Sequence, residues 1–576
     1  MRLSLVKSKN ATQFYVIESY RDTNGKNTSR IIEKLGNEQE VLKKSNGKDP
    51  VAWAKKYVDE LNKKELENSR KIIIEKSQNV QIPMNQQNIF NCGYLFIEKI
   101  YYELKLNNIC NNISKKYNFN FDLNDILSKL VYGRIIFPSS KLATNESSKK
   151  FLEQPKFELQ HIYRALEIIA KENDFIQSEL YKNSLHVMKR NTGVLYYDCT
   201  NYFFEIEEEN GIKQYGISKE HRPNPIVQMG LFMDGNGMPL AFNINSGNTN
   251  EQVTMTPLEE KIIKDFELSK FVVCTDAGLA SNNNRKFNDK DDRAFITTQS
   301  IKKLKKYLKE WALEPSGWSL VESNETYNIS NIEDDNDKIN RYKDCIFFKE
   351  RWINENGLEQ KFIVTFSLKY KSYQKNIRDA QIQRARKAIN TKGFKLDKNN
   401  QNDFKRFITK INITDDGEIV NKKIFSINQN LIAEEEKYDG FYGVCTNLDD
   451  DASDIIKVNK RRWEIEECFR IMKTEFKARP VYLSRDDRII AHFITCYIAL
   501  LIYRLLEKRL DEKFTIEQII YCLRDMNMLY EKSKGFLPAY TRSNLTDKLH
   551  EKFGFRTDYE IITEKNFKKI FKEIKK

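Results

Sequence analysis

The sequence contains little cysteine, proline, glycine or histidine, and each scarcity excludes a class of protein. The 9 cysteines are spread singly without a Cys-x-x-Cys pair, which is typical of reduced, buried thiols and not of a disulfide framework. The 11 prolines and 21 glycines are too few for a collagen-like or low-complexity chain. The 5 histidines form no His-Glu-x-x-His motif, and no Gly-x-x-x-x-Gly-Lys-[Ser/Thr] loop occurs, so zinc hydrolases, zinc deaminases and ATP-driven enzymes are not supported.

The sequence does contain a large apolar fraction and an excess of positive charge. Hydrophobic residues make up 40% of its 576 residues, which is enough for a sizeable core, and this length predicts about four structural units. The 96 lysines and arginines outnumber the 82 aspartates and glutamates, giving a net charge of +14. We therefore expect a polyanion such as nucleic acid as the partner, with an acidic membrane surface as the weaker alternative.

No segment predicts a membrane span. The apolar run at 489–503 lies between two arginines, contains His492, and is shorter than the ~20 apolar residues that a span needs. It predicts a buried helix of a protein with no membrane partner. The N-terminal residues lack an apolar signal core, so we expect a cytoplasmic protein.

The pattern of apolar and charged residues divides the chain into segments. Strands followed by a helix and further strands after Gly193 indicate a mixed α/β sheet. We also expect a turn at 22–26, a charged helix at 51–75 and one long helix at 454–476. The basic stretch at 369–392 is either a surface that follows DNA or a charged helical hairpin. The predicted segments are a small β unit with a charged helix (1–85), a helical region (86–192), the two halves of the α/β core (193–299 and 439–530), an insertion (300–438) and a basic helical tail (531–576).

Two aspartates stand in unusual surroundings. Asp198 lies within a strand of bulky residues, LYYDCT, and Asp276 ends another strand, VVCTDAG. An ionised carboxylate on a buried strand is costly unless it is paired or binds a metal, and at the carboxyl edge of a sheet two carboxylates can converge on a cation. The alternative is that each aspartate caps the turn or helix that follows it.

A third carboxylate, Glu466, lies in the helix NKRRWEIEECFRIMKTEFKARP. It borders an apolar stripe, and Arg462, Arg470 and Lys473 share its face. One interpretation is ordinary salt bridges between residues one turn apart on a solvated helix. The other is a metal-binding carboxylate flanked by cations that bind phosphate oxygens.

The run from Arg462 to Lys473 resembles the Tyr-x2-Arg-x3-Glu-x6-Lys signature of bacterial insertion-sequence transposases of the DDE class. Arg462, Glu466 and Lys473 match its spacing, whereas Asn459 stands at the position of the tyrosine. YGISKEHRPNPIVQMGLFMDGNGMPLAFNINSGNTNE is similar to the family's segment after the first aspartate, and DAGLASNNN to the segment after the second. The resemblance extends from about Gly193 to Leu505, with a weaker echo in ESYRDTNGK and IIEKLG near the N-terminus.

The resemblance implies a fold and a set of functional residues. The fold would be an α/β, RNase H-like mixed-sheet core interrupted by a mainly β insertion domain, with a mostly helical N-terminal DNA-binding region (86–192 binding the DNA ends) and a helical C-terminus. Asp198, Asp276 and Glu466 would be catalytic and would bind two Mg²⁺ or Mn²⁺ ions per active site. The residues expected to contact DNA are Arg462, Lys473, Arg470, His221 and Arg222.

The resemblance also implies an activity. We expect a transposase that cleaves the ends of its insertion sequence and joins the 3′-hydroxyls to target DNA. Its partners would be double-stranded DNA, as terminal inverted repeats and as target, bound by a homodimer in the bacterial cytoplasm near the nucleoid, without a nucleotide cofactor. The alternatives are an RNase H-like nuclease that only hydrolyses DNA, which needs the same carboxylates, and an inactive domesticated DNA-binding copy, against which the intact Asp198, Asp276 and Glu466 argue.

Overall fold

The computed structural model describes most of the chain as two compact units. The first unit is Met1–Gln86 with Lys532–Lys534, and the second is Gln87–Glu531 with Gly535–Lys576. The turn predicted at 22–26 lies outside the described residues. The described residues are 1–7, 12–21, 27–45, 47, 49–68, 71–320, 323, 325–391, 394, 396, 403–411 and 424–576.

The first unit is a small sheet covered by helices. Strands β1 (Arg2–Lys7), β2 (Thr12–Arg21) and β3 (Asn27–Asn37) pair antiparallel, and helices α1 (Glu38–Lys44) and α2 (Pro50–Asn68) follow. Alternation in β2 buries Phe14 and Val16 against Val41 of α1 and Val58 of α2. Helix α2 ends at Asn68, so the predicted helix at 51–75 is too long by its described residues 71–75.

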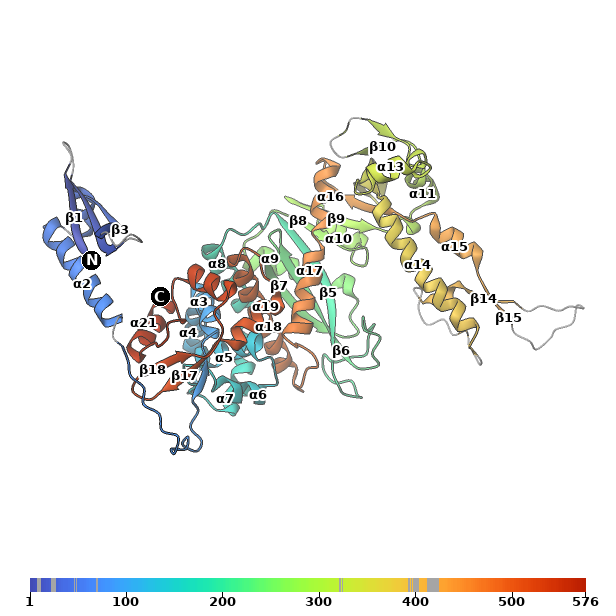
Figure 1. Cartoon of the computed structure of the whole chain (residues 1–576). Coiled ribbons are helices and arrows are strands. Elements are labelled where there is room, and N and C mark those ends of the chain that lie inside the picture. The colour runs from blue at the N-terminus through green and yellow to red at the C-terminus, as the bar shows by residue number, and fades with distance from the viewer. Residues whose placement is uncertain are drawn as a thin grey trace, which may run out of the picture. The chain divides into compact units, whose positions relative to one another are not determined.

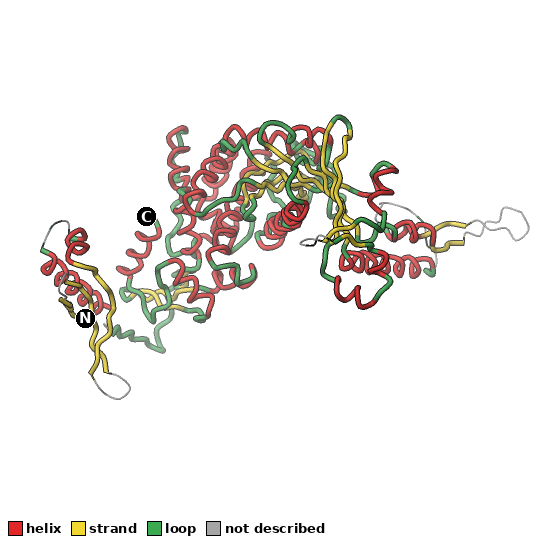
Figure 2. The backbone as a smooth tube through the Cα atoms, turned by 90° about the horizontal axis from the view of Figure 1, so that it is seen from above, coloured by secondary structure: helices red, strands yellow, loops and turns green. Residues whose placement is uncertain are grey.

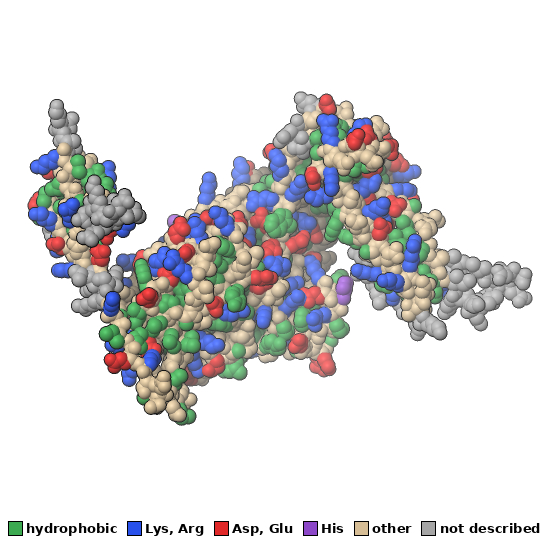
Figure 3. All heavy atoms as spheres, viewed as in Figure 1, with side chains coloured by type: hydrophobic (Ala, Val, Ile, Leu, Met, Phe, Trp, Pro, Cys, Tyr) green, Lys and Arg blue, Asp and Glu red, His purple; other side chains and the backbone are tan. Residues whose placement is uncertain are grey.

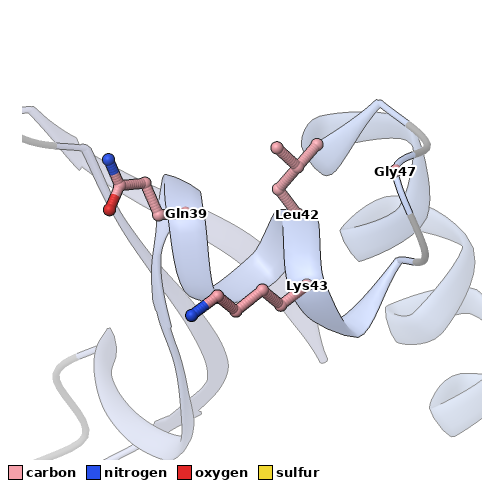
Figure 4. A pocket seen from close by; sticks show the side chains of 4 residues that line it. All are labelled: Gln39, Leu42, Lys43 and Gly47. Carbon is pink, nitrogen blue, oxygen red and sulfur yellow. The ribbon is translucent and has the colours of Figure 1, made fainter.

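A surface pocket of about 430 Å³ lies in this unit, beside α1 (Figure 4). Its lining is Gln39, Leu42, Lys43 and Gly47. None of these side chains is a carboxylate, imidazole or thiol, so the pocket lacks the ligands that a catalytic metal ion requires.

The second unit is built on a ten-stranded mixed sheet with helices beside it (Figure 2). The strand order is β11-β10-β12-β13-β16-β9-β8-β5-β6-β7, in which β5, β8 and β9 are parallel and the other pairs are antiparallel. This confirms the predicted mixed α/β sheet. The strands from β16 to the β7 edge of this order are β16 (Phe441–Thr446), β9 (Arg293–Gln299), β8 (Phe271–Thr275), β5 (Val194–Phe203), β6 (Ile226–Asp234) and β7 (Pro239–Ser246).

Helix α18 (Asp486–Arg509) is the central helix of this unit. It is long and apolar enough to span a membrane by composition, but 94% of its apolar window is buried inside the protein. It packs against α3 (Tyr94–Glu103), α5 (Leu123–Ile136) and α7 (Leu159–Lys171), as Figure 1 shows. The apolar run at 489–503 is therefore a core helix, as predicted. The remaining helices before β9 are α4 (Leu106–Lys116), α6 (Lys141–Ser148), α8 (Asn173–Val187), α9 (Met255–Asp265) and α10 (Asn282–Phe287).

The prediction of a mainly β insertion is wrong, because the described residues between β9 and β16 form both helices and strands. Strand β13 pairs with β16, so its hairpin with β12 continues the large sheet. The basic stretch predicted at 369–392 forms the 22-residue helix α14, whose buried positions Leu368, Ile382 and Ala385 repeat at helical spacing. The elements are α11 (Lys306–Leu313), β10 (Trp318–Leu320), β11 (Thr326–Tyr327), α12 (Ser330–Glu333), α13 (Asn336–Tyr342), β12 (Phe347–Glu355), β13 (Leu358–Phe366), α14 (Leu368–Ile389), β14 (Ile408–Ile411), β15 (Ile424–Ile427) and α15 (Gln429–Glu436).

The helix predicted at 454–476 is divided into three pieces. Helix α16 (Ala452–Lys460) and α17 (Trp463–Arg470) are followed by a π-helical turn at Ile471–Glu475. The C-terminal elements are α19 (Ile516–Asp525), β17 (Asn527–Glu531), β18 (Gly535–Pro538), α20 (Asn544–Phe553) and α21 (Glu564–Ile574). Strand β17 also pairs with β4 (Ile89–Asn91), which joins the C-terminal residues to the start of the unit.

Candidate active site

Asp198, in the middle of β5, and Asp276, which directly follows β8, lie on two neighbouring parallel strands. The last residues paired between β5 and β8 are Tyr196 and Cys274. Each aspartate comes two residues later on its chain, so alternation points both side chains to the face that carries Tyr196 and Cys274. Because neighbouring strands are ~4.8 Å apart, the two carboxyl groups are close together.

The surroundings of Asp198 oppose its ionisation on balance. Burial raises its pKa to about 6, and the carboxylate of Asp276 raises it too, while Lys219, the backbone N–H of Cys199 and the guanidinium of Arg462 act in the opposite direction. The N–H of Cys199 donates to Asp198 Oδ1 at 2.7 Å. Positive groups therefore already surround a carboxyl that lies partly out of water.

Asp276 follows the end of β8 and is half-buried. Its Oδ1 accepts a hydrogen bond from the backbone N–H of Leu279 at 3.0 Å. The capping role considered for this residue is therefore present. It engages one carboxylate oxygen and is compatible with a second partner for the other.

Helix α17 lies along β5, the strand that carries Asp198, and α16 packs against β9 (Figure 1). The Tyr196 hydroxyl donates to the Val458 carbonyl at 2.9 Å, and the Tyr202 hydroxyl contacts Met472 Sδ at 3.8 Å. Asp198 and Arg462 each lie between these two contacts on their own segment, and the guanidinium of Arg462 is one of the groups that act to lower the pKa of Asp198.

Arg462 has no ion pair among the described residues. Its Nε is buried without a hydrogen-bond partner. Burial alone would lower its pKa, but Tyr442, Asp276 and Asp198 raise it above the ordinary value. Arg462 is thus a cation that faces the two aspartates and retains unused donors.

Lys473 approaches the aspartates from the other end of the helix. Its Nζ lies 5.5 Å from the centre of the Tyr202 ring and 3.4 Å from a carboxylate oxygen of Glu220. Burial and the ammonium group of Lys219 lower the pKa of Lys473 to about 8, while Asp198 acts against them. Arg479 also pairs with Glu220, so this glutamate holds the side chains of both Lys473 and Arg479 close to the site.

Glu466 occupies α17 between these cations. It is exposed, and within the described part of the chain it has neither a hydrogen bond nor an ion pair. Arg462 precedes it by one helical turn and Lys473 follows it by two, so the three side chains share a helix face. No contact of Glu466 with Asp198 or Asp276 occurs among the described residues, so its approach to the two aspartates stays a prediction.

Lys219 is a residue of the site that the sequence did not predict. Its ammonium group donates to the carbonyl of Cys199 and lies 3.2 Å from Glu251. Burial lowers its pKa, but Asp198 and Glu251 outweigh burial and raise it. Lys219 belongs to the loop between β5 and β6, which has no periodicity, and the only signal for it is its place two residues before His221.

The structure does not bring the other predicted DNA contacts to the aspartates. The Arg222 guanidinium lies 4.1 Å from the centre of the Phe203 ring. His221 is exposed at a positive φ of 55°, and no contact of its side chain occurs among the described residues. Arg470 points outward and bonds Glu467 at 2.6 and 2.7 Å.

The donor set at the aspartates fits a hard divalent cation. Asp198 and Asp276 supply carboxylate oxygens from two neighbouring strands, and Glu466 is a further carboxylate with no other partner in the described residues, but the ligand oxygens of the three do not all lie within 4.8 Å of one another. Mg²⁺ and Mn²⁺ prefer such oxygen ligands. Residues of the chain thus fit the metal-binding role that the resemblance implies.

A second group of potential ligands, near the C-terminus, does not fit a metal. Asp547, His550 and Asp558 have ligand atoms within 4.8 Å of one another. The backbone N–H of Thr557 donates to His550 Nε2 at 3.1 Å, so the proton of the neutral ring lies on Nδ1, towards Asp558. Arg556 pairs with both aspartates, at 3.2 and 2.5 Å. Arg542 pairs with the same two aspartates, so the charges of two arginines already balance those of the two carboxylates.

Comparisons with known proteins agree with this geometry. A family model described as the transposase DDE domain matches residues 203–502, which is more than half of the chain and includes Asp276 and Glu466. A model for the N-terminal domain of IS1634 family transposases matches residues 3–71. The search of curated proteins finds no match.

Among solved structures, the chain is similar to the piggyBac transposase in a synaptic complex with hairpin DNA, determined by cryo-EM. The identity is 8%, the TM-score is 0.35, and 84% of each chain is covered, which is too weak a likeness to support an argument. The DDE domain implies a general dependence on divalent metal ions. From the two family matches, the chain belongs to the DDE-class insertion-sequence transposases.

Proposed function

We propose that this transposase cleaves DNA at the ends of its insertion sequence and joins the resulting 3′-hydroxyls to target DNA, with Asp198, Asp276 and Glu466 as the catalytic carboxylates. The observation that carries the proposal is the register of β5 and β8, which sets two aspartates side by side beneath the signature helix. We assign the sheet around them to an RNase H-like core. The ions would be two Mg²⁺ or Mn²⁺ held by these carboxylates.

The residues around the carboxylates have distinct roles in this chemistry. Two divalent ions between carboxylates would activate the attacking oxygen of water or of a 3′-hydroxyl and stabilise the leaving oxygen. Arg462, with a buried Nε that lacks a partner, binds the scissile phosphate and fixes its orientation. Lys473 and Lys219 hold positive charge next to Asp198, where the phosphate arrives.

Double-stranded DNA is the proposed partner, as terminal inverted repeats and as target. On the face in view in Figure 3, basic and acidic side chains are intermixed. Arg462, Lys473 and Arg479 add positive charge beside the aspartates, while many other cations of the chain share the overall attraction of DNA. We place recognition of the ends in the residues before the core, and assembly as a homodimer on DNA in the bacterial cytoplasm, at the nucleoid.

The test is cleavage and joining of labelled DNA that carries the element's ends. We expect Asp198→Asn, Asp276→Asn and Glu466→Gln each to lower cleavage by about 10³-fold or more, because each removes an ion ligand, while DNA binding remains. Glu467→Gln is the matched control on the same helix, since its carboxylate pairs with Arg470. Near-normal cleavage by any of the three variants would remove that residue from the site.

The requirement for metal and the joining step are tested in the same assay. Cleavage should need Mg²⁺ or Mn²⁺, stop with EDTA and survive a zinc-selective chelator, because the ligands are all oxygens. Activity of EDTA-treated protein without added metal contradicts the mechanism. If the wild-type protein cleaves DNA but does not join strands, the nuclease alternative is correct. If the wild-type protein neither cleaves nor joins DNA, the inactive DNA-binding alternative is correct.

A further inference from the structure

The hydroxyl of Tyr442 lies at the junction of the strands and helices that form the site. Tyr442 is the second residue of β16, which pairs antiparallel with β9, the strand next to β8. Its hydroxyl lies 2.6 Å from the hydroxyl oxygen of Thr298, on β9. The side-chain N–H of Asn459, in α16, donates to the same hydroxyl at 3.4 Å. One phenol therefore connects β16, β9 and α16.

This connection continues to both sides of the site. The thiol of Cys274 donates to Asn459 Oδ1 at 3.6 Å, and Cys274 precedes Asp276 by two residues. The backbone N–H of Arg462 donates to the carbonyl of Asn459 at 3.3 Å. Asn459 thus joins the strand of one aspartate to the arginine that faces it, and Tyr442 fixes Asn459.

Position 459 is the place where this chain departs from its family's signature. The signature has tyrosine there, one helical turn before the arginine, and this chain has asparagine. Tyr442 contacts Asn459 directly and is one of the groups that raise the pKa of Arg462. A phenol hydroxyl is therefore present beside Arg462, although it comes from a strand and not from the helix.

We propose that Tyr442 is a positioning residue that supplies, from β16, the phenol hydroxyl which the signature places at 459. This inference rests on the proposed function, because the role of Tyr442 is to orient Arg462 towards the scissile phosphate. Without the hydroxyl, Asn459 and the start of the signature helix lose a fixed partner. Alignment of the phosphate suffers, whereas the overall attraction of DNA, which many cations share, does not.

The experiment is single-turnover cleavage of end DNA by the full chain, at saturating DNA, together with binding measured in the presence of Ca²⁺ in place of Mg²⁺. We expect Tyr442→Phe to lower the cleavage rate about tenfold with an unchanged Kd, since it removes alignment only. We expect the double variant Tyr442→Phe/Asn459→Tyr to recover most of this loss, because it returns the hydroxyl to the signature position. Thr298→Val removes the second hydrogen-bond partner of the phenol and should also lower the cleavage rate. This variant tests the inference if Tyr442→Phe does not fold.

Tyr370→Phe is the matched control. Its ring meets that of Tyr442 edge-on, with centroids 6.4 Å apart, and no hydrogen bond of its hydroxyl occurs among the described residues. A wild-type rate for Tyr442→Phe, a change in Kd alone, or no recovery in the double variant would each overturn the inference. Failure of the proposed function is distinguished because the wild-type chain itself would then not cut, or Asp198→Asn would cut normally.

Discussion

The carboxyl group of Asp198 is less stable in its ionised form than an exposed carboxylate would be. Burial, and then the neighbouring Asp276, raise its pKa from the ordinary 3.8 to about 6, although Lys219 acts against them. A raised carboxyl pKa means that the protonated form stabilises the fold, fully below pH 3.8, and that this contribution is lost as the pH rises through 6. At pH 7.5, ionised Asp198 therefore destabilises the metal-free protein by roughly 1–3 kcal/mol.

Asp198→Asn should consequently stabilise the metal-free protein while it abolishes activity. We expect the free energy of unfolding at pH 7.5 to rise by roughly 1–3 kcal/mol, and the difference from wild type to shrink as the pH falls from 6 to 4. Urea unfolding in EDTA across this pH range measures it. A variant that is equal to or less stable than wild type at pH 7.5 would show that the surroundings of Asp198 do not oppose its charge.

Cations on the same helix are expected to differ sharply in importance. Arg462 and Lys473 face Asp198, so Arg462→Ala and Lys473→Ala should lower the single-turnover cleavage rate about tenfold or more and affect binding little. Arg470→Ala is the control, because Arg470 forms an exposed pair with Glu467 that contributes ~0.2–1 kcal/mol of stability. Wild-type rates for the first two variants, with normal folding, would show that their role is structural.

Individual residues of the site differ in how far the sequence predicts them. The proximity of Asp198 and Asp276 is predictable from their places on two strands of one sheet, and the register of β5 and β8 agrees, although Asp198 lies in the middle of β5 and not at its carboxyl end. Lys219 and Tyr442 are not predictable in the same way. Lys219 reaches Asp198 from an irregular loop, and Tyr442 reaches Asn459 across a strand pairing that no local pattern encodes.

At the scale of elements, strands and buried helices follow the sequence pattern more closely than the insertion does. The helix predicted at 454–476 is interrupted after Lys460 and becomes π-helical at Ile471, next to Lys473. Such turns insert an extra residue and re-aim the side chains that follow, which composition does not reveal. The insertion is mixed because α14 follows a helical repeat of buried residues, whereas β13 pairs with β16 and β12 pairs with β13.

Because of that pairing, we expect the insertion to be required for folding. Strand β13 pairs with β16 from Lys361 opposite Thr446 to Phe366 opposite Phe441, and Phe362 and Val364 are buried in the contact. Replacing residues 300–438 by a short Gly-Ser linker removes one neighbour of β16 and should give an insoluble chain without a cooperative thermal transition.

The control deletion replaces only residues 409–426. Strands β14 and β15 form a separate two-stranded sheet, so their removal leaves the ten-stranded sheet paired. We expect this chain to be soluble and to unfold cooperatively by circular dichroism. Cooperative unfolding of the 300–438 deletion would show that the core sheet is complete without β13.

At the scale of the whole molecule, the helical region and the catalytic core share one hydrophobic interior. Helices α3, α5 and α7 come from the predicted 86–192 segment, yet they pack against α18, which lies far along the chain and follows the signature helix. The sequence pattern identifies these helices, but not that they enclose α18, because periodicity says which face is buried and not against what. A chain that begins at Gly193 would lose this interior.

The division between the two units gives a usable test of where the DNA ends are recognised. Residues 1–86 belong to the first unit, which has its own core, while β4 at 89–91 belongs to the second through its pairing with β17. A chain of residues 87–576 therefore keeps the interior around α18 and should fold. Although the resemblance implies that 86–192 binds the ends, we predict that the separate first unit contributes most of their recognition. The 87–576 chain should then lose most of its preference for end DNA over scrambled DNA, at least about tenfold in the ratio of Kd values, while the core cations keep the sequence-independent attraction.

The comparison is made in the Asp198→Asn background, so that the DNA is not cut, with Kd measured at several salt concentrations for both DNAs. Loss of base recognition lowers the preference at every salt concentration, whereas loss of phosphate contacts alone lowers affinity for both DNAs and reduces the salt dependence. If the 87–576 chain, shown to be folded by its thermal transition, discriminates the ends as well as the full chain does, recognition belongs to the second unit. The exposed surfaces of α3 to α8 then become the place to look for it, because they are the part of the predicted end-binding region that truncation leaves in place.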